Sequence, residues 1–266
     1  MSTAQLRREI SHLRERRPPR RRLVTEDRVE FARSVGIDPD KWQKDLLKSE
    51  APRVLLNVAR QAGKSTIAGL IGLHRALYHP RSLILILAPA ERQAKELFSK
   101  VAEAYRTLGH IMPADSYRKM GMELINGSRI EALPGTEKTV RGFSGVDLLI
   151  VDEASRVADD LYYAVRPMLA ISGGRLMLLS TPYGKRGVFF EEWTGGEAWE
   201  RYEVPAAECP RIPASFLEEE RQALPARVYR QEYCNSFEDV EDQVFSHADV
   251  AAAISSEVTP LFGEAS

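Results

Sequence analysis

The sequence predicts an α/β fold in which helices flank a mostly parallel central sheet. Four short apolar runs have the length and composition of strands buried on both faces, at 54–58, 82–88, 146–151 and 175–180. Segments with helical spacing of apolar residues separate most of these runs, and a parallel pair of strands needs such a long crossover. The alternation therefore predicts parallel strands joined by helices.

Length and composition limit the class of protein. The 266 residues, 44% of them hydrophobic, are enough for one large domain or for one large domain with a small one. Cys209 and Cys234 lie far apart without Cys-x-x-Cys spacing, which argues against a structural zinc site or a disulfide framework. No run approaches the ~18 apolar residues of a membrane span, and the N-terminus does not resemble a secretory signal. We therefore expect a soluble intracellular protein without a membrane partner.

Charge is distributed unevenly along the chain. Residues 1–22 contain eight arginines and two glutamates, a balance of +6, so the rest sums to −7 in a chain whose net charge is −1. A basic arm on a mildly acidic body is expected of a protein that contacts nucleic acid or an acidic partner. The alternative is a solvated leader whose arginines have no specific partner.

Two short helices are expected before the first strand. The first covers 25–34 with Thr25 as its N-cap. The second follows Asp38-Pro39 and carries Trp42 and Gln43, about ten residues before the strand.

The first strand leads into a phosphate-binding loop. After Val58 come Arg60-Gln61-Ala62-Gly63 and Lys64-Ser65, followed by a helical pattern. In this layout the backbone N–H groups of the loop and of the helix N-terminus point at phosphates. Lys64 would reach the β/γ-phosphates and the Ser65 hydroxyl would ligate Mg²⁺. The Walker A pattern G-x-x-x-x-G-K-[ST] is incomplete, because Val58 replaces its first glycine, and a chance Gly-Lys-Ser in an ordinary loop is the alternative.

The aromatic–glutamine pair ahead of this loop can hold an adenine, with Gln43 reading its hydrogen-bonding edge. The alternative is a capping helix that Trp42 packs, with Gln43 solvated. The predicted nucleotide-binding residues are Gln43, Arg60, Gln61, Ala62, Gly63, Lys64, Ser65 and Thr66.

The middle of the chain combines a helix, a hairpin and a polar loop. A helix is expected from Ala90 to about Leu108, and Asn126-Gly127 between two apolar runs predicts a hairpin. The glycine-rich loop 134–145 then leads into the next buried strand. Arg141 is the residue of this loop that can offer charge to a phosphate. A surface arginine that holds the loop by a salt bridge is the alternative.

A second signature follows at the end of that strand. Leu148-Leu149-Ile150-Val151 is apolar, and Asp152-Glu153 comes directly after it, as in a Walker B motif. Asp152 is suited to hold Mg²⁺ through water, and Glu153 to polarise the attacking water. Acidic pairs also cap helices, and Ala154 could begin one. The phosphate loop upstream favours the catalytic interpretation, because the two features need each other.

The last predicted core strand, 175–180, ends in Ser180-Thr181-Pro182. Hydroxyls at a strand tip beside an acidic pair can detect a γ-phosphate, and the alternative is an ordinary turn. Shorter elements follow, including a strand at 201–204 and amphipathic helices at about 214–223 and 226–234. We therefore expect four parts: a basic arm at 1–24, a nucleotide-binding core at 25–185, a lid at 186–245 and a linker at 246–266.

With these features in order, the sequence resembles the ATPase part of viral large terminases, which package DNA into procapsids. The family uses an Arg-Gln-x-Gly-Lys-[Ser/Thr] loop without the usual first glycine, so Val58 agrees with the resemblance. The resemblance rests on the order and spacing of several motifs and covers about residues 40–190. These motifs are 60–65, Asn126-Gly127-Ser128, Val140-Arg141-Gly142, 150–154 and 179–184.

The resemblance implies roles for residues and partners. Arg60 and Lys64 would contact phosphates, Ser65 and Asp152 would hold Mg²⁺, and Glu153 would be the catalytic carboxylate. Arg141 would be the arginine finger, with Arg60 a competing candidate, and Ser180-Thr181 would couple hydrolysis to movement. A RecA/ASCE-type, Mg²⁺-dependent ATPase would translocate double-stranded DNA in a homo-oligomeric ring. The ring would meet a portal protein and a small terminase subunit in the host cytoplasm.

Such terminases continue into a metal-dependent nuclease with clustered aspartates. After Phe245 only Asp249, Glu257 and Glu264 are acidic, so DNA cleavage is not expected of this chain and 246–266 would lead toward an absent nuclease domain. Two rival functions stay open. One is a helicase or recombination ATPase on the same core, which duplex unwinding would reveal. The other is a scaffold that binds ATP without turnover, against which the retention of Lys64, Asp152 and Glu153 argues.

Overall fold

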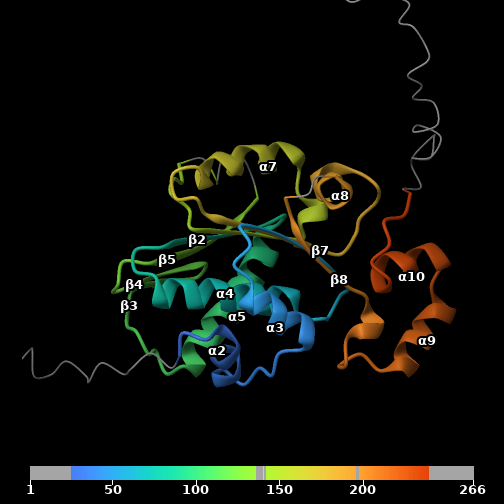
Figure 1. Ribbon diagram of the computed structural model, residues 1–266, viewed down its shortest axis with the longest axis horizontal. Coiled ribbons are helices and arrows are strands. Elements are labelled where there is room, and N and C mark those ends of the chain that lie inside the picture. Colours follow the sequence, from blue (N-terminus) through green and yellow to red (C-terminus); the bar gives the residue numbers. More distant parts are fainter. Residues whose placement is uncertain (1–24, 136–139, 141, 196–197, 240–266) are drawn as a thin grey trace, which may run out of the picture.

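The computed structural model describes residues 25–135, 140, 142–195 and 198–239, and its centre is an eight-stranded sheet (Figure 1). The strand order is β3-β4-β5-β2-β6-β7-β1-β8. The strands are β1 Arg53–Val58, β2 Leu83–Ala88, β3 Ala114–Arg118, β4 Gly121–Leu124, β5 Arg129–Pro134, β6 Leu148–Asp152, β7 Arg175–Ser180 and β8 Glu200–Val204.

Helices cover both faces of this sheet (Figure 1). The first core cluster lies between the sheet and α2 to α5, and the second lies between the opposite face and α7 and α8. No helix in the described part of the chain is long and apolar enough to cross a membrane. The helices are α2 Arg28–Ser34, α3 Lys41–Lys48, α4 Lys64–Tyr78, α5 Glu91–Thr107, α7 Asp159–Val165, α8 Gly187–Thr194, α9 Ala214–Ala223 and α10 Ala226–Tyr233.

The pairing of the strands confirms the predicted, mostly parallel α/β class. Strands β5, β2, β6, β7, β1 and β8 pair in parallel, and only the β3-β4-β5 meander is antiparallel. One strand, β7, separates β1 from β6. The carboxyl ends of β1, β6 and β7 therefore open at one edge of the sheet, where such folds bind ligands.

Local differences from the expected elements have physical reasons. Helix α2 begins at Arg28 because the Asp27 carboxylate, rather than Thr25, accepts the backbone N–H groups of Val29 and Glu30. Strand β3 was not predicted, since its residues are polar and mostly exposed or half-buried. The sequence predicts a helix from about Asp159 to Leu169, and the structure divides it into α7 and a 3₁₀ turn at Arg166–Leu169 that includes Pro167.

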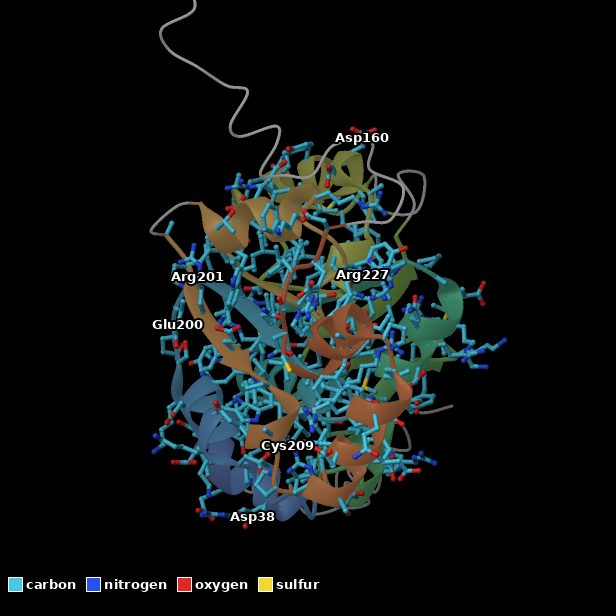
Figure 2. All side chains as sticks on the ribbon, turned by 90° about the vertical axis from the view of Figure 1, so that its right-hand side faces the viewer. Asp38, Asp160, Glu200, Arg201, Cys209 and Arg227 are labelled. Carbon is cyan, nitrogen blue, oxygen red and sulfur yellow. The ribbon has the colours of Figure 1, made fainter. Side chains whose placement is uncertain are left out.

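Strand β8 belongs to the central sheet. It pairs in parallel with β1, from Val54 opposite Glu200 to Val58 opposite Val204. The Arg201 guanidinium (Figure 2) donates to the carbonyls of Glu192 and Gly195, which binds β8 to the end of α8. A separate lid over 186–245 stays a prediction, but α8 and β8 pack as core elements. We call the segment after β8, residues 205–239 with α9 and α10, the appendage (Figure 1).

The end of the appendage is tied to β1 by a reciprocal amide pair. Asn57 Nδ2 donates to the Asn235 carbonyl and Asn235 Nδ2 donates to the Asn57 carbonyl, each at 3.0 Å. Both side chains are buried, and Asn235 has a φ of 58°, a left-handed conformation that asparagine tolerates. The two bonds join residues 178 positions apart in sequence.

We expect this pair to stabilise the fold measurably. Asn235→Gly keeps the left-handed backbone but removes the hydrogen bond from Asn235 Nδ2 to the Asn57 carbonyl, a loss of about 0.5–1.5 kcal/mol. Asn235→Ala adds about 1 kcal/mol of backbone strain. Urea unfolding followed by circular dichroism compares both variants with the wild type. An Asn235→Gly variant as stable as the wild type would contradict this expectation.

Candidate nucleotide-binding site

The loop between β1 and α4 has the backbone of a phosphate cradle. Gly63 is the N-cap of α4 with a φ of 91°, and Gln61 has a φ of 62°. A Cβ on Gly63 would lie 2.9 Å from Gln43 Nε2, so both conformation and space require glycine here. Val58, where the usual motif has a glycine, is a fully buried residue of β1. The turn begins after it, which explains why valine is tolerated.

Two side chains hold the peptide between Ala62 and Gly63. Gln43 Nε2 and Arg211 donate to the Ala62 carbonyl, at 3.1 and 2.9 Å. Arg211 also pairs with Asp40, and Gln43 Oε1 accepts the Asp40 N–H. Gln43 is therefore buried and engaged at both ends of its amide, so the solvated alternative is wrong and adenine reading stays a prediction. Sequence reasoning missed Arg211, which lies in the appendage and belongs to no motif.

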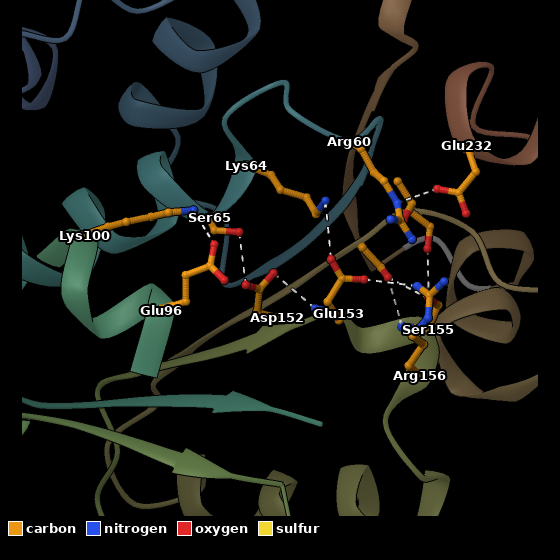
Figure 3. A network of polar contacts seen from close by, with 12 residues as sticks. Arg60, Lys64, Ser65, Glu96, Lys100, Asp152, Glu153, Ser155, Arg156 and Glu232 are labelled. Atoms are coloured by element: carbon orange, nitrogen blue, oxygen red, sulfur yellow. Dashed lines mark hydrogen bonds and ion pairs between the residues drawn. The ribbon is translucent and has the colours of Figure 1, made fainter. Parts of the chain in front are cut away.

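The hydroxyl and the first carboxylate predicted for magnesium lie together (Figure 3). Ser65 Oγ, in the first turn of α4, donates to Asp152 Oδ2 at 3.0 Å. Asp152 is buried at the end of β6, and this burial raises the pKa of its carboxyl while the Lys64 charge opposes the shift. The sheet thus brings together two residues separated by 87 positions.

Hard oxygen donors of this kind suit Mg²⁺, which prefers one or two carboxylates and takes its other ligands from phosphates and water. The Ser65 hydroxyl and the Asp152 carboxylate fit that requirement. No cluster of three or more His, Cys, Asp or Glu side chains that could hold a metal occurs among the residues placed by the structure.

The second carboxylate, Glu153, is held from two sides. Its Oε1 lies 3.6 Å from Lys64 Nζ, and its Oε2 accepts from Arg156 at 3.1 Å (Figure 3). The backbone of Glu153 is left-handed, with φ 51° and ψ 42°. The element that follows is a 3₁₀ turn, Ala154–Arg156, which Glu153 does not cap through its side chain. The side chain is instead directed to the phosphate loop.

Ser180 and Thr181 lie beside the acidic pair, at the tip of β7. Both are fully buried. The hydroxyls of Ser155 and Ser180 share a hydrogen bond of 2.6 Å, and Ser155 Oγ donates to the Thr181 carbonyl at 2.8 Å. These bonds join the segment after Glu153 to the end of the next strand.

Of the two candidate arginines, Arg60 and Arg141, the described residues include Arg60. Arg60 is half-exposed and forms an ion pair with Glu232 of α10 at 2.5 Å, so its side chain faces the appendage (Figure 3). Arg141 lies outside the described residues. Thr66 follows Ser65 in the first turn of α4 and is partly buried.

Comparison with known proteins gives one family for most of the chain. A model of the family described as "Terminase large subunit, T4likevirus-type, N-terminal" matches residues 55–250. The terminase large subunit of Thermus virus P23-45 is 25% identical over 256 residues, covering 83% of this chain and 53% of the relative. The chain thus spans about half the length of the curated relatives it matches.

Solved structures share the fold. The ATPase domain of the Thermus phage P74-26 large terminase has a TM-score of 0.68 at 21% identity, covering 79% of this chain and 98% of that domain. A large terminase of another thermophilic bacteriophage, solved in complex with ADP, has a TM-score of 0.62 at 9% identity, covering 78% of this chain and 53% of that one.

The burial of Asp152 predicts a trade between stability and function. Burial raises its pKa, so the folded state holds the proton more tightly than the unfolded state does. Stability is then lost as pH rises through the folded pKa, and the nucleotide-free protein carries this cost at neutral pH. Asp152→Asn removes the charge, and we expect the melting temperature to rise at neutral pH and to rise less in acid.

Calorimetry at two pH values tests this, with Asp115→Asn on exposed β3 as the control that should change little. Affinity for nucleotide in the presence of Mg²⁺ should fall only in Asp152→Asn. A lower melting temperature for Asp152→Asn at neutral pH would contradict the expectation.

Proposed function

The chain belongs to the terminase large-subunit family, and from this premise we propose that it hydrolyses ATP to drive viral DNA packaging. One observation carries the enzymatic part of the proposal. Lys64 and Ser65 at the start of α4 meet Asp152 and Glu153 at the end of β6, with bonds or ion pairs between the two segments. A phosphate cradle, a magnesium-compatible oxygen pair and a second carboxylate are the parts that hydrolysis of a nucleoside triphosphate requires.

Each residue of the site would have its own role in the hydrolysis of ATP. The phosphates would draw the Lys64 ammonium away from Glu153, because an almost buried cation gains most from the highest nearby negative charge. Glu153 Oε1 then becomes free to accept a proton from the attacking water. Ser65 and Asp152 would hold Mg²⁺, which neutralises charge on the phosphate oxygens when bound.

The arginines and the appendage supply the proposed link to movement. Arg60 pairs with Glu232 on α10, so a phosphate that attracted Arg60 would break a contact between loop and appendage. Arg141 remains the candidate arginine finger, acting from a neighbouring subunit. Ser180 and Thr181 are tied through Ser155 to the segment that carries Glu153, which suits them to couple hydrolysis to movement.

Translocation of double-stranded DNA, the homo-oligomeric ring, the portal protein and the small terminase subunit are proposed from family membership. Motors of this kind grip the DNA backbone without reading bases, so weak, salt-sensitive binding is expected. The family match gives no support to the helicase alternative. Unwinding of a labelled fork by this chain would contradict the packaging proposal.

Glu153→Gln tests the chemical step. A glutamine cannot accept the proton from water, so phosphate release should fall by about 100-fold or more while affinity for ATP changes by less than about two-fold. Release is followed with a phosphate sensor and binding with a fluorescent nucleotide. Glu103→Gln on the exposed side of α5 is the control. Unchanged release in Glu153→Gln would refute the assigned role.

Subunit mixing tests the ring and Arg141. Wild-type turnover per subunit should rise with protein concentration, and Arg141→Ala should lose about 10³-fold of its rate. Mixing Arg141→Ala with Glu153→Gln should restore turnover, because each supplies what the other lacks. Turnover independent of concentration, and abolished only by Arg60→Ala, would place the complete site in one subunit.

A further inference from the structure

Arg156 contacts the proposed catalytic carboxylate on the side away from the nucleotide loop. The 3₁₀ turn Ala154–Arg156 brings residue i+3 over residue i, so its guanidinium reaches Glu153 Oε2 at 3.1 Å. Lys64 holds the other oxygen, Oε1, at 3.6 Å. The two cations therefore fix the two oxygens of one carboxylate separately.

Tyr183 supports Arg156 from the next strand tip. The Arg156 guanidinium lies 4.4 Å from the centre of the Tyr183 ring, and Arg186 approaches the same ring at 5.4 Å. A planar guanidinium that stacks on an aromatic ring keeps its donors in a defined plane. Tyr183 lies two residues beyond Thr181, in the segment that follows β7. An unbroken chain of contacts thus runs from Tyr183 through Arg156 to Glu153.

The two contacts on Glu153 have different fates when a nucleotide binds. Lys64 would be needed by the phosphates and would leave Oε1, whereas Arg156, which lies in the turn after β6 and not in the phosphate loop, would stay on Oε2. Without Arg156 the carboxylate would lose its remaining hold and could rotate away from the attacking water. Misplacement by about 1 Å can cost on the order of 10²-fold in rate.

We propose that Arg156 is a positioning residue for hydrolysis, which holds Glu153 Oε2 so that Oε1 faces the attacking water, and that Tyr183 fixes Arg156. The inference rests on the proposed ATPase function. It gives the segment after β7 a direct mechanical path to the carboxylate: displacement of Tyr183 turns the guanidinium, and the guanidinium turns Glu153.

Steady-state kinetics of Arg156→Ala and Arg156→Lys test the first half. We expect kcat of Arg156→Ala to fall by about 10–100-fold, with KM and the affinity for ATPγS within about two-fold of wild type. Arg156→Lys, which keeps the charge without the planar fork, should recover part of the loss. Arg166→Ala is the matched control, because Arg166 also stacks on a tyrosine, Tyr162, at 5.4 Å, and pairs with Glu192 at 3.7 Å. Its kcat should not change.

Variants at Tyr183 test the second half. Tyr183→Leu should lower kcat, Tyr183→Phe should not, and Tyr183→Leu added to Arg156→Ala should cause no further loss, because Tyr183 acts through Arg156. Tyr183 is partly exposed, so Tyr183→Leu also serves if Arg156→Ala does not fold.

Unchanged or increased kcat in a folded Arg156→Ala overturns the inference, and so does a loss that appears only in KM. Additive losses in the double variant overturn the role of Tyr183. If the wild type does not hydrolyse ATP, both the proposed function and this inference are refuted. If the wild type is active and Arg156→Ala has the same kcat, only the inference is refuted.

Discussion

The hydrogen bond from Ser65 to Asp152 is the constraint on which the site depends, because it joins two segments that only the sheet brings together. The register shows how. Leu56 of β1 lies opposite Leu179 of β7, and Asp152 of β6 lies opposite the same Leu179. β1 continues for two residues beyond this level before the loop begins, so the start of α4 faces the end of β6. A one-residue slip would turn Asp152 to the other face of the sheet.

The charges at this edge form an alternating series. Lys64 and Arg156 flank Glu153, and Lys64 also lowers the cost of burying Asp152. Buried ions are tolerated when they are paired and hydrogen-bonded, as Lys64, Asp152 and Glu153 are here. A bound polyphosphate would replace Glu153 as the partner of Lys64. The ion pair between Lys64 and Glu153 is therefore an interaction that a bound substrate could replace.

The part of the site that could be predicted is the part encoded in short segments. The loop at 60–66 and the pair Asp152-Glu153 each carry their own signal, and four apolar runs marked the strands that align them. Arg211, Glu232 and Asn235 could not be found in this way, because their partners lie more than 145 positions away and no local pattern marks them. Strand β3 was missed because it lacks apolar alternation. The place of β8 beside β1 follows from topology, which the residues of β8 do not reveal.

ATP and a divalent ion are proposed to bind at the edge of the sheet where Lys64 and Ser65 meet Asp152 and Glu153. A crystal structure with ATPγS and Mn²⁺, whose anomalous signal locates the ion, tests it most directly. We expect the ion beside Ser65 and Asp152, with Lys64 Nζ contacting a phosphate oxygen instead of Glu153. An ion elsewhere, or Lys64 still paired with Glu153 while nucleotide is bound, would contradict it.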